Sequence, residues 1–529
     1  TAADSKLIAE YIYEAFYSPD AQARNNPPRK DLARLTTDQF RNSVMDLLGR
    51  FRLGPGFDRP IGPEQGLKGV YRGVAVPKPG EQLEDLSKNK GIKKRRANFN
   101  FERVDAGVAF HFGADSPDKE KMIAEQFDLR WDGSVVASET GVYEFAVKSE
   151  NGFRLYINDT SDGNALIDGW VSAGPQVREE KKSIFLVGGR AYRLALEHFK
   201  FKEQSASIEL WWKTPHGVKE LIPAHALRTD RPRELALVST EFPADDSSGG
   251  YPRGTTISKS WDQAVTDAAI TTAEQVIAKI DELAQTKPGA PDRAAKLRKF
   301  AETFVETAFR RPVADEMKQL IIESQFKAAK TPETAVKRIV MLTLKSPQFL
   351  YPDLSDADDY QTASRLALAL WDSLPDKKLM QSAAAGKLKT RDQIRAEAQR
   401  MISDPRTKAK LHGFFHQWLE LERAEGSSKD PKVFPDFTPE VFADLRESLF
   451  QFIDEVVWSE KSDYRELLQA DYLLLNERLG KFYGHPVTGD EFQRVGFDPK
   501  QRAGVVTHPY LLASLAYTKQ SSPVHRGVF

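Results

Sequence analysis

The sequence predicts a multidomain α+β protein in which a mostly α-helical frame carries an inserted β-rich module. Residues 66–228 hold short runs of β-branched and aromatic residues separated by turn residues, whereas both flanking parts have apolar residues at helical spacing. Stretches rich in glycine and proline at 53–66 and 242–254 mark the boundaries between these parts. The length of 529 residues is enough for three or four domains.

The composition argues against several classes of function. Hydrophobic residues make up 40% and charged residues 29%, and no run of 18 apolar residues occurs, so we expect no transmembrane segment. The 76 basic residues balance 76 acidic ones, which argues against nucleic acid as a partner because phosphate binding needs a basic surplus. The absence of cysteine excludes disulfides, thiolate catalysis, zinc–thiolate sites and covalently attached haem within this chain.

The N-terminal part is predicted to be helical. Residues 4–17 have apolar residues at helical spacing, and a small helical domain is expected over 18–65. In that domain Thr36 or Thr37 fits the N-cap of a helix, and Gly49 marks its C-terminal end. The chain begins at Thr1 without a visible signal peptide, as a processed precursor or an excised fragment would, and we expect it to be cut at its C-terminal end.

A linker at 229–255 leads into further helical sequence. Prolines divide this part, and we expect helical domains at 256–355 and 356–490, followed by the start of another domain at 491–529. Asp372 and Asp376 flank one of the prolines, and a role as helix N-caps is favoured over paired acid–base chemistry. Helices are predicted over 264–284, 292–308, 315–329, 332–344 and 442–458.

The β-rich module contains a predicted hairpin. Residues 142–147 and 153–157 are apolar runs, and the polar residues and glycine at 149–152 separate them. On a later strand Trp211 and Trp212 are neighbours, so one should face the core and the other the surface. The basic run at 93–96 is predicted to be a solvated loop, with contact to an acidic partner as the alternative.

One tyrosine and five short motifs of the module carry a resemblance to a known family. They are Tyr71 and residues 141–145 (GVYEF), 152–156 (GFRLY), 166–170 (LIDGW), 189–192 (GRAY) and 208–212 (IELWW). With them the module resembles the protective-antigen-type (PA14) β-sandwich found in bacterial toxins, some glycosidases and fungal adhesins. The resemblance implies an inserted antiparallel β-sandwich, and it implies recognition of a glycan or polymer outside the cell.

Sugar-binding members of that family usually hold Ca²⁺ through two adjacent aspartates before the glycine of the hairpin, and Glu150 and Asn151 stand at these positions. Calcium prefers several hard oxygen ligands with enough negative charge, and this pair supplies one charge. The alternative is that the pair caps a turn. Further candidate ligands nearby are Asp159, Asp162 and Asp168, and Trp212 is the candidate for stacking on a sugar.

The helical parts resemble a family of large exported proteins common in planctomycete-type bacteria, whose uncharacterised helical domains usually accompany c-type cytochrome segments. Residues 11–16 resemble the last helix of such a segment, and the family continues past Gly527 toward a haem-attachment motif. Haem c is therefore expected only in parts outside this chain. The resemblance rests on residues 35–42, 242–254, 258–262, 308–312, 346–351, 363–366, 370–376, 415–419, 471–476, 507–510 and 522–527.

Four histidines are candidates for haem contact. His412 and His416 are four residues apart on a predicted helix and share a face, although the glutamate of the zinc-hydrolase pattern is missing and half-buried packing is the alternative. His508 and His525 lie in the C-terminal family segments, where imidazoles either approach haem or occupy turns beside prolines.

Three hypotheses for the function follow. The first is the central, haem-free portion of an exported c-type-cytochrome-family protein, periplasmic or at the cell surface, with a glycan-binding β-sandwich and with cytochrome domains or another redox partner. The second is a structural or adhesive surface protein without a redox centre. The third is a glycan-active enzyme with an unrecognised site, and whether any reaction is catalysed stays open. No serine elbow, phosphate loop or dinucleotide motif occurs, which argues against the common hydrolase, kinase and dehydrogenase classes.

Overall fold

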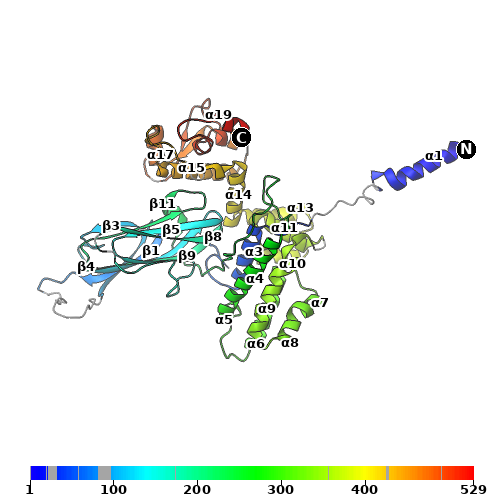
Figure 1. Cartoon of the computed structure of the whole chain (residues 1–529), viewed down its shortest axis with the longest axis horizontal. Helices are drawn as coiled ribbons and strands as arrows, with labels where there is room; N and C mark the ends of the chain where they lie inside the picture. Colours follow the sequence, from blue (N-terminus) through cyan, green and yellow to red (C-terminus); the bar gives the residue numbers. More distant parts are fainter. Residues whose placement is uncertain are drawn as a thin grey trace.

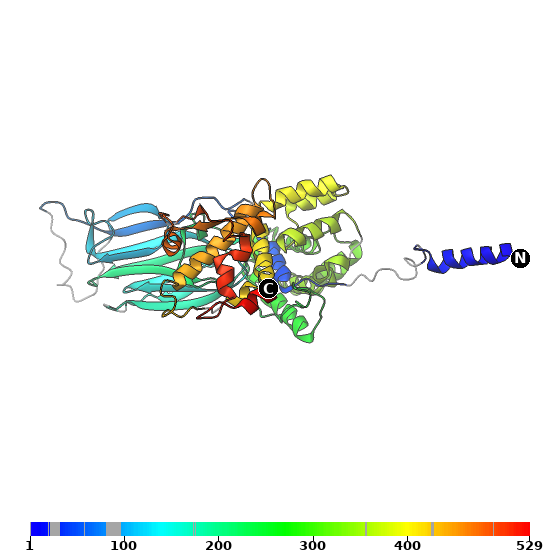
Figure 2. The same ribbon diagram turned by 90° about the horizontal axis from the view of Figure 1, so that it is seen from above.

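The computed structural model describes residues 2–19, 21, 32–57, 59–80, 97–172, 174, 176–354, 357–424, 428–489 and 491–529. A β-sandwich lies at one end of the molecule, a group of helices lies at the other, and the C-terminal helices lie against the sandwich (Figures 1 and 2). The predicted fold class, a mostly α-helical frame with an inserted antiparallel β-sandwich, is confirmed. The basic run at 93–96 lies outside the described residues.

Two antiparallel sheets form the sandwich. The larger has the order β2-β1-β4-β9-β6-β7 with β12 beside β4, and the smaller has the order β11-β10-β5-β8 with β3 beside β10. The strands are β1 (Leu67–Ala75), β2 (Phe99–Asp105), β3 (Ala109–Gly113), β4 (Met122–Ala137), β5 (Gly141–Ser149), β6 (Gly152–Ile157), β7 (Ile167–Gly169), β8 (Arg178–Leu186), β9 (Arg190–Phe201), β10 (Ala206–Lys213), β11 (Lys219–Leu221) and β12 (Leu227–Arg228), with a 3₁₀ turn η3 (Ala224–Ala226).

The predicted hairpin at 142–157 is wrong. β5 pairs with β8 and β10 in the smaller sheet, whereas β6 pairs with β7 and β9 in the larger one. The chain therefore crosses between the sheets at Glu150 and Asn151. Both strands have several inward-facing apolar residues, which a crossing strand buries in the common core between the sheets.

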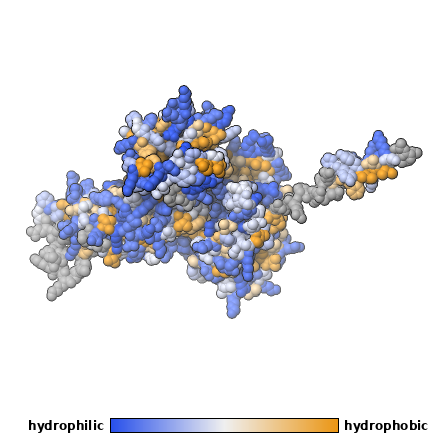
Figure 3. Space-filling view, turned by 45° about the horizontal axis from the view of Figure 1, so that its top comes forward, coloured by the Kyte–Doolittle hydropathy of each residue, from blue (hydrophilic) through white to orange (hydrophobic). Residues whose placement is uncertain are grey.

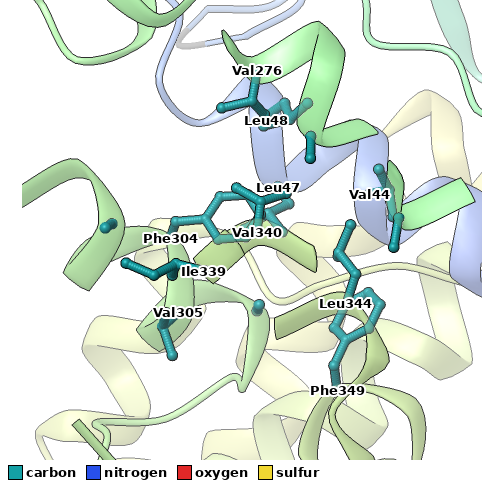
Figure 4. Close-up of a cluster of buried hydrophobic side chains, with 14 of the residues drawn as sticks. Val44, Leu47, Leu48, Val276, Phe304, Val305, Ile339, Val340, Leu344 and Phe349 are labelled. Atoms are coloured by element: carbon teal, nitrogen blue, oxygen red, sulfur yellow. The ribbon is translucent and has the colours of Figure 1, made fainter. Parts of the chain in front are cut away.

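A helix from before the sandwich packs with helices from after it. Val44, Leu47 and Leu48 of α3 (Thr37–Gly49) share a core with apolar residues of α4 (Lys259–Ala278), α6 (Arg293–Ala308) and α9 (Pro332–Lys345) (Figure 4). Burial of this shared apolar surface stabilises the frame across the insertion. The unit also contains α5 (Ile280–Leu283), α7 (Asp315–Lys318), η4 (Gln319–Glu323), α8 (Ser324–Ala328), α10 (Pro347–Leu350) and η5 (Pro352–Leu354).

Two further groups of helices complete the frame. A small core forms between α11 (Asp359–Trp371), α12 (Lys377–Ala384) and α13 (Arg391–Ile402), and α14 (Pro405–Trp418) leads from it into the C-terminal group. That last group contains η6 (Leu421–Ala424), α15 (Pro439–Val457), α16 (Glu466–Gln469), β13 (Tyr472–Leu475), α17 (Glu477–Tyr483), β14 (Gln493–Gly496), η7 (Gly504–Thr507), α18 (Pro509–Ser514) and α19 (Pro523–Val528).

Local capping signals were predicted well in two of three places. Thr36 is the N-cap of α3 and forms a capping box with Gln39. Asp376 accepts from Leu379 N at 2.8 Å and caps α12. Asp372 is instead the C-cap of α11, with a left-handed φ of 50°, so its predicted N-cap role is wrong. Its carboxylate accepts from Gln39 and Lys410.

The sandwich is anchored to the frame through largely buried ion pairs. Asp46 of α3 accepts from Arg190 at the start of β9, from Arg406 of α14 and from Ser373 Oγ. Glu139, in the turn after β4, pairs with Arg446 of α15. Because Ala137 and Arg190 are paired in register, both anchors lie at the same end of the sandwich.

The predicted N-terminal helix is present as α1 (Ala2–Ile12) followed by the π-helical turn η1 (Tyr13–Tyr17). It lies apart from the rest of the described chain, and hydrophobic side chains along it are exposed (Figure 3). Among the residues that the structure describes, no helix combines the length and the apolar character that crossing a membrane requires.

Candidate functional site

Three connections meet at the end of the sandwich that lies away from the anchors. They are the crossing at Glu150 and Asn151, the segment after β7 with Trp170 and Ser172, and the β9–β10 connection with Ser205. Ser205 Oγ donates to the Glu150 carboxylate, and Ser172 Oγ donates to the Glu150 carbonyl at 3.2 Å. We call these five residues the Glu150 site.

Asn151 faces inward rather than toward solvent. It is fully buried, its Nδ2 donates to Ser205 O at 3.1 Å, and its Oδ1 lies 3.3 Å from His198 Nε2. Burial lowers the pKa of His198 to about 3, and Lys200 adds to this although a hydrogen bond with the Ser207 backbone opposes it. A neutral His198 with hydrogen on Nε2 fits donation to Asn151, so this amide is used inside the fold.

Glycine at position 152 allows the connections to approach closely. A Cβ added to Gly152 would lie 2.1 Å from the Phe199 ring and 2.6 Å from the Trp170 carbonyl oxygen. The small residue therefore brings Trp170 beside the crossing.

Trp170 is half-buried and is held by its neighbours. Its ring lies 4.7 Å from the Phe199 ring, and the Arg154 guanidinium lies 4.6 Å from its centroid. Asp168 accepts from Arg154 Nε at 3.1 Å and from Trp170 N at 3.1 Å. The hydrogen bond from Arg154 lowers the pKa of Asp168, so this carboxylate is ionised and already paired.

The expectation that Asp159 and Asp162 add oxygens beside Glu150 is wrong. Asp159 follows the far end of β6, and six extended residues separate the two places by about 20 Å. Asp159 accepts from Ser161 N and Asn164 Nδ2, and Asp162 is exposed in the same loop. Asp159 is near Glu150 in the sequence, but the length of the extended strand β6 places the two residues far apart in space.

Calcium stays a prediction for Glu150 and Asn151. The structure gathers serine hydroxyls, carbonyls and one carboxylate around the crossing. Within the described ranges, no group of three or more histidine, aspartate or glutamate side chains is placed to hold a metal ion. Ca²⁺ takes six to eight oxygen ligands and favours negatively charged ones. The Glu150 carboxylate supplies one such charge.

The stacking role predicted for Trp212 is wrong, although the alternation along β10 is confirmed. Trp212 is 4% exposed and packs with Tyr143 and Phe145 in the core. Trp211 faces outward, with Lys148 Nζ 4.2 Å from its ring centroid. Alternation predicted that one of the two indoles faces out, but the face of the sheet that is buried decides which one.

His412 and His416 lie on one face of α14 but have different partners. His412 Nε2 lies 2.9 Å from Asp454 Oδ1 of α15. Burial raises the pKa of Asp454, but His412 and Lys408 lower it more, so the net direction is down. The His416 ring lies 3.9 Å from the ring of His216, which belongs to the sandwich. His412 therefore packs between α14 and α15, and His416 packs between α14 and the sandwich. Haem contact by either residue stays a prediction.

His508 and His525 lie in the C-terminal group. His508 is 1% exposed and caps α18, because its Nδ1 accepts from Tyr510 N at 3.3 Å and its Nε2 lies 3.4 Å from Ser448 Oγ. Burial lowers the pKa of His508 to about 3. His525 Nδ1 lies 3.2 Å from Leu515 O. These placements favour a structural role for His508, while haem contact by either residue stays a prediction.

The sequence interpretation missed two features, namely an aromatic residue of the Glu150 site and a group of arginines. Trp170 was recognised as part of a motif but not as a site residue, and its position after a short strand and before polar residues was the available signal. The second group is a cluster of arginines to which the segment 228–233 (RTDRPR) contributes; that arginine-rich segment was visible in the sequence.

Two family models match parts of the chain. Residues 78–226 match the PA14 domain, and residues 357–485 match a family described as a protein of unknown function (DUF1592). The chain thus combines a PA14 β-sandwich with a helical region of an uncharacterised family. Neither description mentions a cytochrome.

Individual proteins also resemble parts of the chain. The anti-sigma-I factor RsgI3 of Acetivibrio thermocellus is 30% identical over 131 residues, which is 25% of this chain and 19% of that protein. A solved anti-sigma factor domain-containing protein from Clostridium clariflavum is 25% identical with a TM-score of 0.25, covering 34% of this chain and 52% of that one. A solved PA14 sugar-binding domain from an RTX adhesin is 16% identical with a TM-score of 0.23, covering 31% and 98%.

Proposed function

We propose that the chain is part of an exported or cell-surface protein that attaches to a glycan through the Glu150 site of its PA14 β-sandwich. The observation that carries this proposal is the match of residues 78–226 to the PA14 domain, because this range contains the whole Glu150 site. The helical frame acts as a scaffold for the sandwich. The function is thus structural or adhesive.

The chemistry of the Glu150 site suits a sugar. Ligand sites typically combine aromatic side chains with a few converging polar groups. Here the Trp170 backbone lies close to Gly152 at the crossing, and its indole packs against Phe199 and Arg154. The Ser205 hydroxyl contacts the Glu150 carboxylate, and the Ser172 hydroxyl contacts the Glu150 carbonyl. The carboxylate accepts from sugar hydroxyls, the serine hydroxyls donate or accept, and the indole provides an apolar face.

The position of the site within the molecule supports attachment. Phe199 lies nine residues along β9 from Arg190, the residue that anchors the sandwich to Asp46. At about 3.3 Å per residue, the Glu150 site lies about 30 Å from that anchor. A polymer bound there therefore lies away from the Asp46 anchor.

The redox hypothesis has weaker support than the adhesive one. It rests on the resemblance of the flanking helical segments, and the chain has no cysteine for covalent haem attachment. A Soret band in the absorption spectrum of natively purified protein would favour the redox hypothesis over the adhesive one.

A glycan array probed with the full chain tests the proposal. We expect binding to a defined group of glycans, and Trp170→Ala should weaken the tightest of these interactions at least about ten-fold, a loss of about 1.4 kcal/mol. Trp211→Ala is the matched control, because it removes a partly exposed indole from the opposite sheet. The proposal is contradicted if both variants lose glycan affinity equally, or if the wild type binds no glycan.

Calcium dependence is tested in the same assay. If Glu150 and Asn151 share an ion, as the family resemblance implies, a chelator abolishes glycan binding and added Ca²⁺ restores it. Glu150→Gln should remove this restoration. Binding that is unchanged by the chelator leaves the glycan proposal standing and ends the calcium prediction.

A further inference from the structure

An open pocket with four arginines lies where the sandwich meets the frame. Its volume is about 290 Å³, and Arg52 from the segment after α3, Arg193 from β9, and Arg231 and Arg233 from the linker line it. Asp159 and the loop that follows it form another side. The pocket is thus at the anchored end of β6, away from the Glu150 site.

The carboxylates around this pocket already have partners. Asp159 accepts from Ser161 N at 2.9 Å and from Asn164 Nδ2 at 2.7 Å. Glu234 pairs with Lys279 at 2.9 Å. Glu282 accepts from Arg233 Nη1 at 2.5 Å. Among these contacts, Arg233 pairs with one of the three carboxylates. The charges of Arg52, Arg193 and Arg231 are therefore not neutralised by these pairs.

Three of the guanidiniums keep donors that the described contacts do not use. The Arg193 Nη2 donates to Asp132 at 2.8 Å, but its Nε is buried without a hydrogen-bond partner among the residues that the structure describes. Arg231 approaches Asp132 only to 3.9 Å, and Arg52 donates to the Glu234 carbonyl. A guanidinium carries five N–H donors, so the pocket has more donors than acceptors.

Two other positive charges, those of Arg231 and Arg130, lie close enough to Arg193 to affect its pKa. Burial lowers the pKa of Arg193, Asp132 opposes this, and the neighbouring Arg231 and Arg130 lower it further. An anion placed among these guanidiniums relieves the repulsion. Guanidinium groups bind carboxylate, sulfate and phosphate oxygens in a two-pronged geometry.

The backbone around the pocket is held in place before any ligand binds. Asn158 has a left-handed φ of 70°, and its side chain donates to Leu235 O at 2.9 Å and accepts from Leu235 N at 2.8 Å. This clamp fixes the linker that carries Arg231 and Arg233 against the end of β6. Fixed donors lose little conformational freedom on binding, which favours affinity.

We propose that this pocket binds an oxyanion group: the carboxylate, sulfate or phosphate of a small ligand or of an acidic sugar. A volume of about 290 Å³ is at the lower limit for ligand pockets and suits one such group with a small attached ring. The site is separate from the Glu150 site and independent of the glycan that binds there.

Isothermal titration calorimetry on the full chain tests the proposal, with inorganic phosphate, inorganic sulfate, glucuronate and glucose 6-sulfate as probes at constant ionic strength. We expect at least one of them to bind, and Arg231→Ala to weaken it about ten-fold or more because a charge-assisted hydrogen bond is lost. Arg231 is chosen because its side chain is 46% exposed and lies 3.9 Å from Asp132, so its removal disturbs the fold little.

Arg72→Ala is the matched control, since it removes one positive charge from an exposed position on β1 of the same sandwich. Tighter binding of the two sugar probes than of the inorganic ions indicates that the anion enters as part of a sugar, and the reverse order indicates a free anion. The proposal is overturned if the wild type binds none of the four probes, or if both variants weaken binding equally. A wild type that binds none of the probes overturns the proposal even if Arg231→Ala folds poorly.

Discussion

Asp46→Asn should weaken the attachment of the sandwich to the frame and lower the melting temperature of the protein. The Asp46 carboxylate accepts from Arg190 Nη2 at 2.8 and 2.9 Å, from Arg406 Nη1 at 2.9 Å and from Ser373 Oγ at 2.7 Å. The amide keeps the volume but leaves the buried Arg190 guanidinium facing a neutral group, and Arg406 keeps only its pair with Asp404. Removing one partner of a buried charge pair costs about 3–5 kcal/mol.

The effect should depend on pH in a defined direction. Burial raises the pKa of Asp46, but Arg190, Arg406 and Ser373 lower it more, so the folded-state pKa is below the usual value. A depressed carboxyl pKa contributes stability that is present above the unfolded pKa of about 4 and is lost as pH falls through the folded pKa. The difference between Asp46→Asn and wild type should therefore be largest at neutral pH and shrink below about pH 4.

Differential scanning calorimetry measures this effect. For a unit of 150–250 residues each kcal/mol changes the melting temperature by about 2–4 °C, so a decrease of about 6–20 °C is expected. Asp463→Asn makes the same chemical change in a more exposed pair with Arg465 and should lower the melting temperature much less. If Asp46→Asn lowers the melting temperature no more than Asp463→Asn does, the anchoring argument is wrong.

Three further predictions concern other parts of the chain. Gly152→Ala should destabilise the sandwich by about 1–3 kcal/mol in urea unfolding, because its Cβ meets the Phe199 ring. Gly413→Ala, in open space on α14, should instead stabilise by about 0.5–1 kcal/mol. Burial raises the pKa of Glu220 to about 7, so its charge opposes folding above that pH and Glu220→Gln should raise stability at pH 8 by about 1–3 kcal/mol. The pKa of His508 is lowered to about 3, so the unfolded chain takes up a proton first and stability falls as pH drops below about 6.5. His508→Asn keeps the cap and should remove about 1.4 kcal/mol per pH unit of this dependence between pH 6 and 4.

Features that depend on neighbouring residues were predictable from the sequence. The capping box of Thr36 and Gln39 lies within four residues, and the same holds for the cap at Asp376. The alternation of Trp211 and Trp212 follows from strand geometry alone. The insertion of the sandwich was also predictable, because the change from helical to strand-like patterning occurs at residues 66 and 228.

Features that depend on distant partners were not predictable. The polar residues before Gly152 are as compatible with a crossing as with a hairpin, and only the pairing of β5 with β10 and of β6 with β9 decides between them. The inward direction of Asn151 depends on His198 and Ser205, about fifty residues away. A single sequence contains no information on which distant residues pair, so the composition of both sites had to come from the structure.

The two proposed sites should respond differently when the sandwich is loosened from the frame. The Glu150 site consists of sandwich residues alone, whereas the arginine pocket combines Arg193 of the sandwich with Arg52 of the frame. An oxyanion that contacts both parts binds only the anchored arrangement and must stabilise it by linkage. Asp46→Asn should therefore weaken anion binding at the pocket while leaving glycan binding at the Glu150 site unchanged. Equal weakening at both sites would mean that the replacement disturbs the sandwich itself rather than its attachment.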